Sequence, residues 1–399
     1  MSTVLLNNGK LVMPDRVIPN GEVVIENGMI TMAGRLSHHY GRSADITIDA
    51  QGGFILPGFI DTHSDAIEKE LEPRPGAYFT TEVAFSELEK KLAGQGITTM
   101  YHSFSLAGAQ YGVRADQVAA KCIRAIVKMA RDYASIRNKI HLRFEVTNFE
   151  AVDVIQDLIT EGAVDLLSFM DHTPGQGQYP TVEDYRRYLE KTYHLPLDKI
   201  GEILALKEQG RIKAEECIVR LSQAARAAGI RLASHDDDSA DSISYYQQHG
   251  VTLSEFPINL PTAAAARKAG VDVSVGAPNI VRGGSTGKGM RAIDAITAGS
   301  ANIVCSDYYP PAMLHAVFLL ADQTISIAEA VSLVTTAPAK ALQLNDVGSL
   351  EEGKYGDVII VRKRNNTPVV TNTIVGGVPV YGMNYRVTLP DDRAEQSAC

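Results

Sequence analysis

Short apolar runs alternate with longer amphipathic stretches through most of the chain. Many of the amphipathic stretches end in glycine, as at Gly94 and Gly229, which is typical of helix C-termini. Eight such apolar runs predict strands at 59–65, 98–104, 139–146, 164–172, 230–238, 251–257, 272–279 and 301–307. Eight β/α units over about 250 residues predict a (β/α)8 TIM-like barrel. A doubly wound open sheet is the rival, but the glycine-rich phosphate loop it favours after the first strand is missing.

The two ends of the chain have a different pattern of short alternating strands split by turns. Asn-Gly turn signals recur at Asn8, Asn20 and Asn27, and a similar texture returns over residues 347–381. Each end is too small to bury a core alone. We therefore predict one β-sandwich domain built from residues 1–53 and 343–386. The barrel then occupies residues 54–342, and residues 387–399 form a polar tail.

The connection at about 175–228 is long for a link between two barrel units. Its charged, helix-like sequence predicts a helical insertion. Such insertions cover barrel mouths as lids, or they form dimer contacts or packing elements. The sequence favours neither.

Composition narrows the class of protein. The 399 residues are 45% hydrophobic and 21% charged, so a large core is expected. The net charge of −9 argues against nucleic acid or an anionic membrane as the main partner. No apolar run reaches the length of a membrane span, and the N-terminus lacks the pattern of a signal peptide. We expect a cytoplasmic protein, and a homodimer.

The four cysteines do not form a recognisable site. They are widely spaced and make no CxxC pair, which argues against a disulfide framework or a cysteine-based zinc site. They are Cys122, Cys217, Cys305 and Cys399.

Most of the predicted strands end in residues that bind metals. In a barrel the carboxyl ends of the strands carry the chemistry, and charged groups there need partners or a metal. The predicted metal ligands are His63, Asp65, Glu145, His235, Glu255 and Asp307. His102 is as well explained by a structural hydrogen bond. Glu255 would also fit an arginine pair, and most of the acidic run 236–238 would fit a helix cap.

The loop after the seventh predicted strand favours phosphate. It carries cations, hydroxyls and glycines whose backbone N–H groups can approach an anion. The predicted substrate-binding residues are Asn279, Arg282, Gly283, Gly284, Ser285 and Lys288, with Arg74 as a second anion clamp. The spacing is not that of a Walker loop. A flexible glycine loop and a surface turn at Arg74 are the plainer explanations.

These motifs resemble a known superfamily. The segment 57–63, Pro-Gly-Phe-Ile-Asp-Thr-His, resembles the first-strand signature of the amidohydrolase superfamily. Segments 335–342 and 350–358 resemble its later helix and turn, with Tyr355 in place of the common alanine. Six further blocks are similar to the PhnM family, at 72–75, 170–176, 233–237, 255–257, 276–285 and 306–310.

The PhnM family is the diphosphatase of the carbon–phosphorus lyase pathway. The resemblance implies a small-molecule phosphorylated substrate, α-D-ribose 1-methylphosphonate 5-triphosphate, which is cleaved to the 5-phosphate and pyrophosphate. It also implies two divalent metal ions, with Glu145 as the bridging ligand because the fourth strand has no lysine. Zinc is the expected metal, and the oxygen-rich ligand set leaves manganese or iron open. A single ion is the alternative, since the first strand offers His-x-Asp in place of His-x-His.

The expected chemistry is hydrolysis at the α-phosphorus. A metal-activated water attacks, Asp307 takes its proton, and His172 or His235 stabilises the developing charge. Two other functions stay open from the sequence. One is an amidohydrolase acting on a cyclic amide, N-acyl or lactone substrate, and the other is a non-catalytic metal-binding component of a phosphonate-processing complex.

Overall fold

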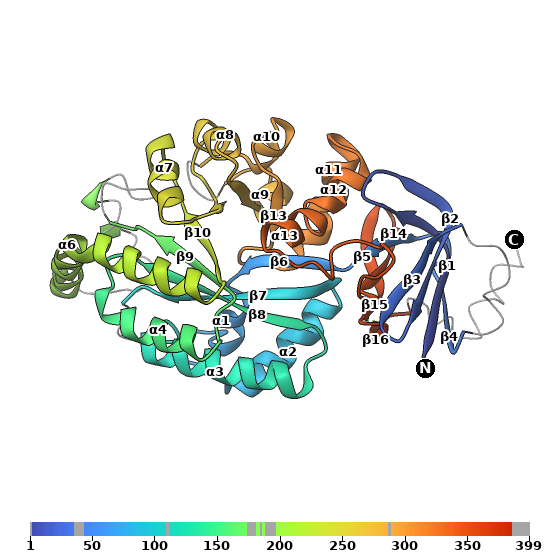
Figure 1. Ribbon diagram of the computed structural model, residues 1–399, viewed down its shortest axis with the longest axis horizontal. Coiled ribbons are helices and arrows are strands. Elements are labelled where there is room, and N and C mark those ends of the chain that lie inside the picture. The colour runs from blue at the N-terminus through green and yellow to red at the C-terminus, as the bar shows by residue number, and fades with distance from the viewer. Residues whose placement is uncertain are drawn as a thin grey trace, which may run out of the picture.

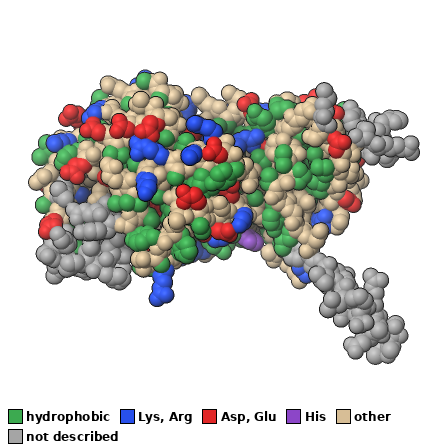
Figure 2. Space-filling model, turned by 90° about the horizontal axis from the view of Figure 1, so that it is seen from below, with side chains coloured by type: hydrophobic (Ala, Val, Ile, Leu, Met, Phe, Trp, Pro, Cys, Tyr) green, Lys and Arg blue, Asp and Glu red, His purple; other side chains and the backbone are tan. Residues whose placement is uncertain are grey.

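The computed structural model describes residues 2–35, 44–108, 112–173, 181–183, 186–187, 197–285 and 289–384. A barrel with its surrounding helices lies beside a second sheet formed by the two ends of the chain (Figure 1). Within these ranges no helix combines the length and apolar character needed to cross a membrane. Acidic and basic side chains are interspersed over the face shown in Figure 2.

The barrel contains eight parallel strands in chain order, which confirms the predicted fold class. The strands are β6 (Phe59–Ser64), β7 (Ile97–Leu106), β8 (Arg137–Glu145), β9 (Leu166–Met170), β10 (Arg231–His235), β11 (Leu253–Glu255), β12 (Asp272–Gly276) and β13 (Ile303–Cys305). The ring closes between β13 and β6. There the Asp307 amide donates to the His63 carbonyl at 2.9 Å, and the Asp65 amide donates to the Asp307 carbonyl at 2.8 Å.

Helices between the strands cover the outside of the barrel (Figure 1). They are α1 (Ala66–Leu71), α2 (Thr81–Ala93), α3 (Asp116–Tyr133), a short 3-10 turn (Phe149–Ala151), α4 (Val152–Thr160), α6 (Leu197–Ala227), α7 (Ala240–Gln248), α8 (Leu260–Lys268), α9 (Ala277–Arg282), α10 (Ala292–Thr297), α11 (Ala312–Gln323), α12 (Ile327–Ser332) and α13 (Thr336–Ala341). The local sequence determines where several of these helices begin. The side chains of Thr80, Ser239 and Asn259 cap α2, α7 and α8, each accepting a backbone N–H.

The seventh strand is shorter than the predicted 272–279. β12 ends at Gly276, and α9 begins at Ala277 with Pro278 in its first turn. Proline suits that position because the first helical N–H groups have no partner within the helix. Asn279 therefore lies on a helix.

The barrel has an apolar floor and a polar mouth. Tyr101, Leu166, Ala233 and Leu253 from different strands pack together with Leu342, which follows α13. This cluster fills the end of the barrel at which the strands begin. Polar side chains such as Ser103, His141 and Glu255 occupy the buried positions further along the strands. The chemistry is thus confined to the carboxyl ends.

Most of the described part of the predicted insertion belongs to one long helix. α6 spans 31 residues and packs against α4 on the outside of the barrel. The segment 175–196, where we expected a lid, lies almost entirely outside the described residues.

The second sheet combines strands from both ends of the chain, as predicted. Its order is β16-β15-β14-β5-β1-β2-β3, with β4 paired to β1. The strands are β1 (Thr3–Val12), β2 (Val17–Glu26), β3 (Met29–Gly34), β4 (Ile46–Asp49), β5 (Phe54–Pro57), β14 (Val358–Arg364), β15 (Thr367–Val375) and β16 (Val378–Gly382). β14 pairs antiparallel with β5, which joins the two ends. The domain boundaries at residues 53 and 343 stay predictions.

Gly58 carries the chain from this sheet into the barrel. A Cβ at this position would lie 2.2 Å from Thr98 Oγ1, so the Thr98 side chain leaves room only for glycine.

Candidate active site

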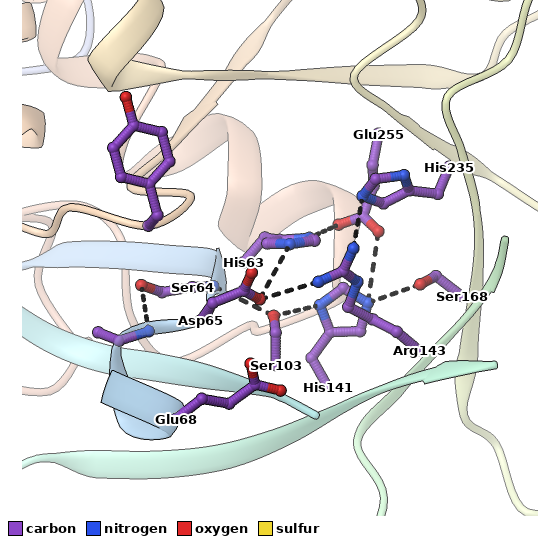
Figure 3. Close-up of polar contacts among 12 residues, drawn as sticks. His63, Ser64, Asp65, Glu68, Ser103, His141, Arg143, Ser168, His235 and Glu255 are labelled. Atoms are coloured by element: carbon purple, nitrogen blue, oxygen red, sulfur yellow. Dashed lines mark hydrogen bonds and ion pairs between the residues drawn. The ribbon is translucent and has the colours of Figure 1, made fainter. Parts of the chain in front are cut away.

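A first group of metal-binding side chains lies at the centre of the barrel mouth. His63 Nδ1 lies 3.0 Å from Glu255 Oε1, and His141 Nε2 lies 3.3 Å from Glu255 Oε2 (Figure 3). Ser103 Oγ and Ser168 Oγ lie 3.1 Å and 3.0 Å from the two ring nitrogens of His141. All three members are almost fully buried. We call His63, His141 and Glu255 the first ion group.

A second group follows strands β9 and β10. Asp236 Oδ2 lies 3.0 Å from His235 Nδ1 and 3.4 Å from His172 Nε2. His172 is held from its other side, since its Nδ1 lies 2.8 Å from Glu145 Oε2. The Lys207 ammonium donates to Glu145 Oε1 at 2.5 Å. We call His172, His235 and Asp236 the second ion group.

The Arg143 guanidinium lies between Asp65 and His235 of the second ion group (Figure 3). It donates to Asp65 Oδ1 at 2.9 Å and contacts His235 Nε2 at 3.2 Å. Asp65 thereby faces a fixed positive charge at the edge of the first group.

Three residues beyond the strand ends adopt left-handed backbone conformations. Asp236, Phe256 and Asp307 have φ values of 58°, 54° and 58°. Such conformations are uncommon for residues other than glycine and cluster at functional sites. They direct the chain sharply away from the barrel while keeping the carboxylates of Asp236 and Asp307 at its mouth.

Both ion groups fit a divalent cation. Within each group, one potential ligand atom per residue lies within 4.8 Å of those of the other two. Two buried carboxylate oxygens, Glu255 Oε2 and Asp236 Oδ2, make no hydrogen bond within the described ranges. Unsatisfied buried polar atoms are costly, and a cation would satisfy them.

The protonation states also suit metal binding. Burial lowers the pKa values of His63 and His235, so both rings are neutral near pH 7. Burial alone would raise the pKa of Glu255, but His141 and His63 outweigh it and hold the carboxyl ionised. Metal ligands must be deprotonated, so His63, His235 and Glu255 need no change of charge to bind an ion.

Comparison with known proteins places this site in a family. The model of the amidohydrolase family matches residues 54–380. The chain belongs to the amidohydrolase family. Members of this family are typically metal-dependent hydrolases, in agreement with the two ion groups.

Two curated relatives match most of the chain. The α-D-ribose 1-methylphosphonate 5-triphosphate diphosphatase of Escherichia coli K12 is 33% identical over 371 residues, covering 91% of this chain and 96% of the relative. An imidazolonepropionase of Porphyromonas gingivalis is 25% identical and covers 90% of this chain and 89% of its own.

Solved amidohydrolase structures share the fold at low identity. The N-acetylglucosamine-6-phosphate deacetylase of Pasteurella multocida superposes with a TM-score of 0.62 at 13% identity, covering 94% of this chain and 99% of that one. The N-isopropylammelide isopropylaminohydrolase of Burkholderia multivorans gives a TM-score of 0.63 at 16% identity, covering 96% and 99%.

The amidohydrolase fold brings most of the predicted ligands together. His63, Asp65, His235 and Glu255 surround Arg143 at the barrel mouth (Figure 3). Asp307 lies beside them through its backbone contacts with β6. Glu145 is not a member of either ion group. Its two carboxylate oxygens already accept hydrogen bonds, one from Lys207 and one from His172.

His141, Arg143 and Lys207 were not predicted as site residues from the sequence, and Asp236 was left open within the acidic run 236–238. His141 and Arg143 precede the end of β8, but they alternate with Leu142 and Phe144 and so face the same side as Glu145. That alternation was a usable signal. Lys207 comes from α6, and nothing in its local sequence indicates the contact with Glu145.

Other polar residues near the strand ends serve local structure. His102 Nε2 contacts Asn138 Oδ1 at 2.8 Å, away from the ion groups, so its structural explanation fits the geometry. Asp237 Oδ2 accepts from Ser234 and Ser254, both at 2.5 Å. Asp171 accepts the Thr173 amide at 2.9 Å.

The predicted substrate loop is partly described. Asn279 fastens it, because its amide donates to the Met290 carbonyl at 3.0 Å and accepts the Ala292 amide at 2.9 Å. Gly283 ends α9 in a left-handed conformation, and the Gly284 amide donates to the Asn279 carbonyl. Ser285 is half-buried, and Lys288 lies outside the described residues.

Arg74 lies in an exposed turn that pairs with Ala77. Neither of the two ion groups found among the described residues includes Arg74.

Proposed function

We propose that this amidohydrolase cleaves α-D-ribose 1-methylphosphonate 5-triphosphate to α-D-ribose 1-methylphosphonate 5-phosphate and pyrophosphate, in phosphonate catabolism. The observation that carries the proposal is the similarity to the Escherichia coli diphosphatase, 33% identical over almost the full length of both chains. Zinc is the proposed metal, because each ion group offers two imidazoles beside one carboxylate.

Cations beside Asp307 support a polyphosphate substrate. Lys69, on α1, donates to the Tyr308 carbonyl at 3.0 Å and lies over the Tyr308 ring at 4.9 Å from its centre. Arg282, on α9, donates to the Tyr308 hydroxyl at 3.3 Å. Two exposed cations thus meet at the residue that follows Asp307. They suit the multiple charges of a pyrophosphate leaving group, which a neutral amide or lactone lacks.

Asp307 is the proposed general base. A divalent cation held by the residues of the two ion groups would supply Lewis acidity and lower the pKa of water. Burial and the neighbouring Asp65 carboxylate raise the pKa of Asp307 to about 7. A carboxylate with this pKa can accept a proton from the attacking water near neutral pH. The rim cations Lys69 and Arg282 then hold the departing pyrophosphate.

For His172 and Glu145 we propose roles that differ from those predicted. Glu145 accepts from His172 Nδ1, which leaves His172 Nε2 facing Asp236. A carboxylate that orients a histidine from behind is the usual support of a metal ligand. We therefore assign His172 to ion binding, and Glu145 to positioning it with Lys207 as counter-ion.

The test is phosphorus NMR of the zinc-loaded enzyme with the ribose 1-methylphosphonate 5-triphosphate. Equal amounts of pyrophosphate and the 5-monophosphate support cleavage of the anhydride bond between the α- and β-phosphates. Orthophosphate as the first product would place the cleavage elsewhere in the chain of phosphates. An unchanged spectrum with zinc, manganese and iron would reject the proposal, and amide and lactone substrates would then be tested.

The Asp307→Asn variant tests the base. Its kcat should fall by roughly 10²–10⁴-fold, the usual contribution of a general base, while its zinc content is retained. Because a base acts only when deprotonated, wild-type kcat/KM should rise with pH through about 7 and level off above it. The variant should lose that rise. Normal turnover in the variant would show that Asp307 is not the base.

The cytoplasmic location, the homodimer and the absence of nucleic-acid binding stay predictions from the sequence.

A further inference from the structure

Arg143 is a buried cation whose guanidinium lies next to Asp65 and to His235, a member of the second ion group. The residue is 9% exposed, and it projects from β8. One of its nitrogens, Nε, makes no hydrogen bond within the described part of the chain. Its other two nitrogens contact Asp65 and His235 (Figure 3).

The contact with His235 fixes the tautomer of that ring. A guanidinium has only donors, and a neutral imidazole has one N–H and one lone pair. His235 Nε2, at 3.2 Å from Arg143, must therefore carry the lone pair, and Nδ1 must carry the proton. That Nδ1 lies 3.0 Å from Asp236 Oδ2 at an orientation that makes no hydrogen bond.

In this state neither nitrogen of His235 can bind an ion. Nε2 is occupied by Arg143, and Nδ1 has no free lone pair. Binding through Nε2 requires Arg143 to leave. Binding through Nδ1 moves the proton to Nε2, where it faces the donor N–H of Arg143. Either way the contact between Arg143 and His235 is lost when the second ion group is filled.

We propose that Arg143 and an ion in the second group are alternatives, and that Arg143, once released from His235, binds a phosphoryl group of the substrate. Asp65 keeps the guanidinium at the barrel mouth through its own 2.9 Å contact. The released N–H groups are then available to a phosphoryl group, with which a guanidinium forms a favourable bidentate contact. The second half of this inference rests on the proposed function, and the first half does not.

A purely structural Arg143 predicts the opposite behaviour. If it only neutralised Asp65, removing it would weaken the protein and the metal site together. If it competes with the ion, removing it tightens metal binding while weakening phosphate binding.

The experiment compares Arg143→Met with wild type and with Arg114→Met. Arg114 is a suitable control because its main partner is Glu68, at 2.7 Å, and it stays 3.8 Å from Asp65. Zinc affinity is measured on the full chain by competition with a chelating dye, and affinity for inorganic pyrophosphate by calorimetry. Removing one charge-assisted hydrogen bond from His235 should tighten the weaker zinc site about tenfold.

Arg143→Met should also raise the Kd for pyrophosphate about tenfold, while Arg114→Met keeps the zinc affinity of wild type. Unchanged or weaker zinc binding in a folded Arg143→Met protein overturns the competition. If that variant does not fold, Arg143→Lys replaces it, since one ammonium cannot span Asp65 and His235. Zinc binding no tighter than wild type in the lysine variant overturns the proposal equally.

The outcomes separate this inference from the proposed function. Tighter zinc binding without turnover of the triphosphate would retain the competition and reject the substrate. Turnover with unchanged zinc affinity would do the reverse.

Discussion

His172 is held between two carboxylates, and this makes ion binding sensitive to pH. Burial alone would lower the pKa of His172, but Glu145 and Asp236 outweigh it and raise the pKa to about 9. The ring therefore carries a proton at neutral pH in the metal-free protein. A metal ligand must lose that proton.

We predict that zinc binding releases a proton from His172 at every pH below about 9. Zinc affinity should therefore rise with pH below about 9 and level off above it. Proton release is measured with a pH indicator in weak buffer as zinc is added to the metal-free protein.

The His172→Gln variant provides the control, because glutamine has no proton to lose. Its proton release should be smaller by close to one per bound ion. The same release in both proteins would show that His172 stays outside the metal site. The raised pKa also stabilises the metal-free fold below pH 6.5, and this stabilisation is lost as the pH rises through 9.

How far the site could be predicted depended on where each residue lies on its strand. His63, Glu255 and Asp307 could be predicted because they end apolar runs, where a barrel gathers its chemistry. His102 lies one position from Ser103, whose hydroxyl reaches the site at His141. A shift by one residue turns a side chain to the other face of a strand. Lys207 could not be predicted, because its contact spans 62 residues of sequence.

At the level of elements, a single glycine in α6 lets this helix lie directly against the backbone that follows β8. A Cβ on Gly210 would lie 2.0 Å from the Thr147 carbonyl oxygen. Lys207 is one turn earlier on the same helix, so this close approach also sets the reach of its ammonium to Glu145.

We predict that Gly210→Ala shifts α6 outward and weakens the Lys207–Glu145 pair. The cost should be about 1–3 kcal/mol in free energy of unfolding, as for other overpacked sites. Chemical denaturation measures it. Gly201→Ala in the same helix meets nothing within 4 Å and should stabilise by about 0.5–1 kcal/mol. Equal effects of the two substitutions would contradict the close approach.

Element types were largely predictable, whereas one boundary was not. All eight barrel strands lie within or overlap their predicted ranges, because their burial on both faces gives continuous apolar runs. The end of β12 was misplaced because Ala277 and Pro278 continue the apolar run. Proline in fact starts α9 there, and Asn279 serves that helix and the loop after it.

For the whole molecule, the contact of Asp357 with Arg137 joins the terminal sheet to the barrel. Asp357 is buried, accepts from Arg137, and also accepts the Gly376 amide at 2.8 Å. The Arg137 guanidinium lies 4.6 Å from the centre of the Tyr355 ring. The main hydrophobic cluster also crosses this boundary, since it contains both Leu56 and Ile97.

We predict that Asp357→Asn lowers the stability of the whole chain by about 1–3 kcal/mol, because it leaves the buried end of Arg137 without its counter-ion. Thermal unfolding should still occur in one transition. Asp322→Asn is the matched control. It breaks the exposed pair with Lys363 at 2.9 Å, which also joins the sheet to a barrel helix, and should cost at most about 1 kcal/mol. Two separate transitions in the Asp357 variant would show that sheet and barrel unfold independently.

The pattern of short alternating strands and turns at the two ends predicted a shared sheet, but it did not predict which strands pair with each other. Turn signals and alternation mark strands without showing their neighbours. β5 lies between β1 and β14, so its two partners come from opposite ends of the chain.

That position of β5 has a consequence for synthesis on the ribosome. One edge of β5 can pair with β1 as soon as both have emerged, but the other edge waits for β14, which is translated after the entire barrel. During that interval Ile55 and Leu56 belong to an unpaired, apolar strand edge. Such edges promote aggregation of nascent chains unless chaperones shield them. We expect the barrel to fold first and β14 to cover the open edge of β5 afterwards. Translation speed over the final segment then determines how long newly made molecules stay vulnerable.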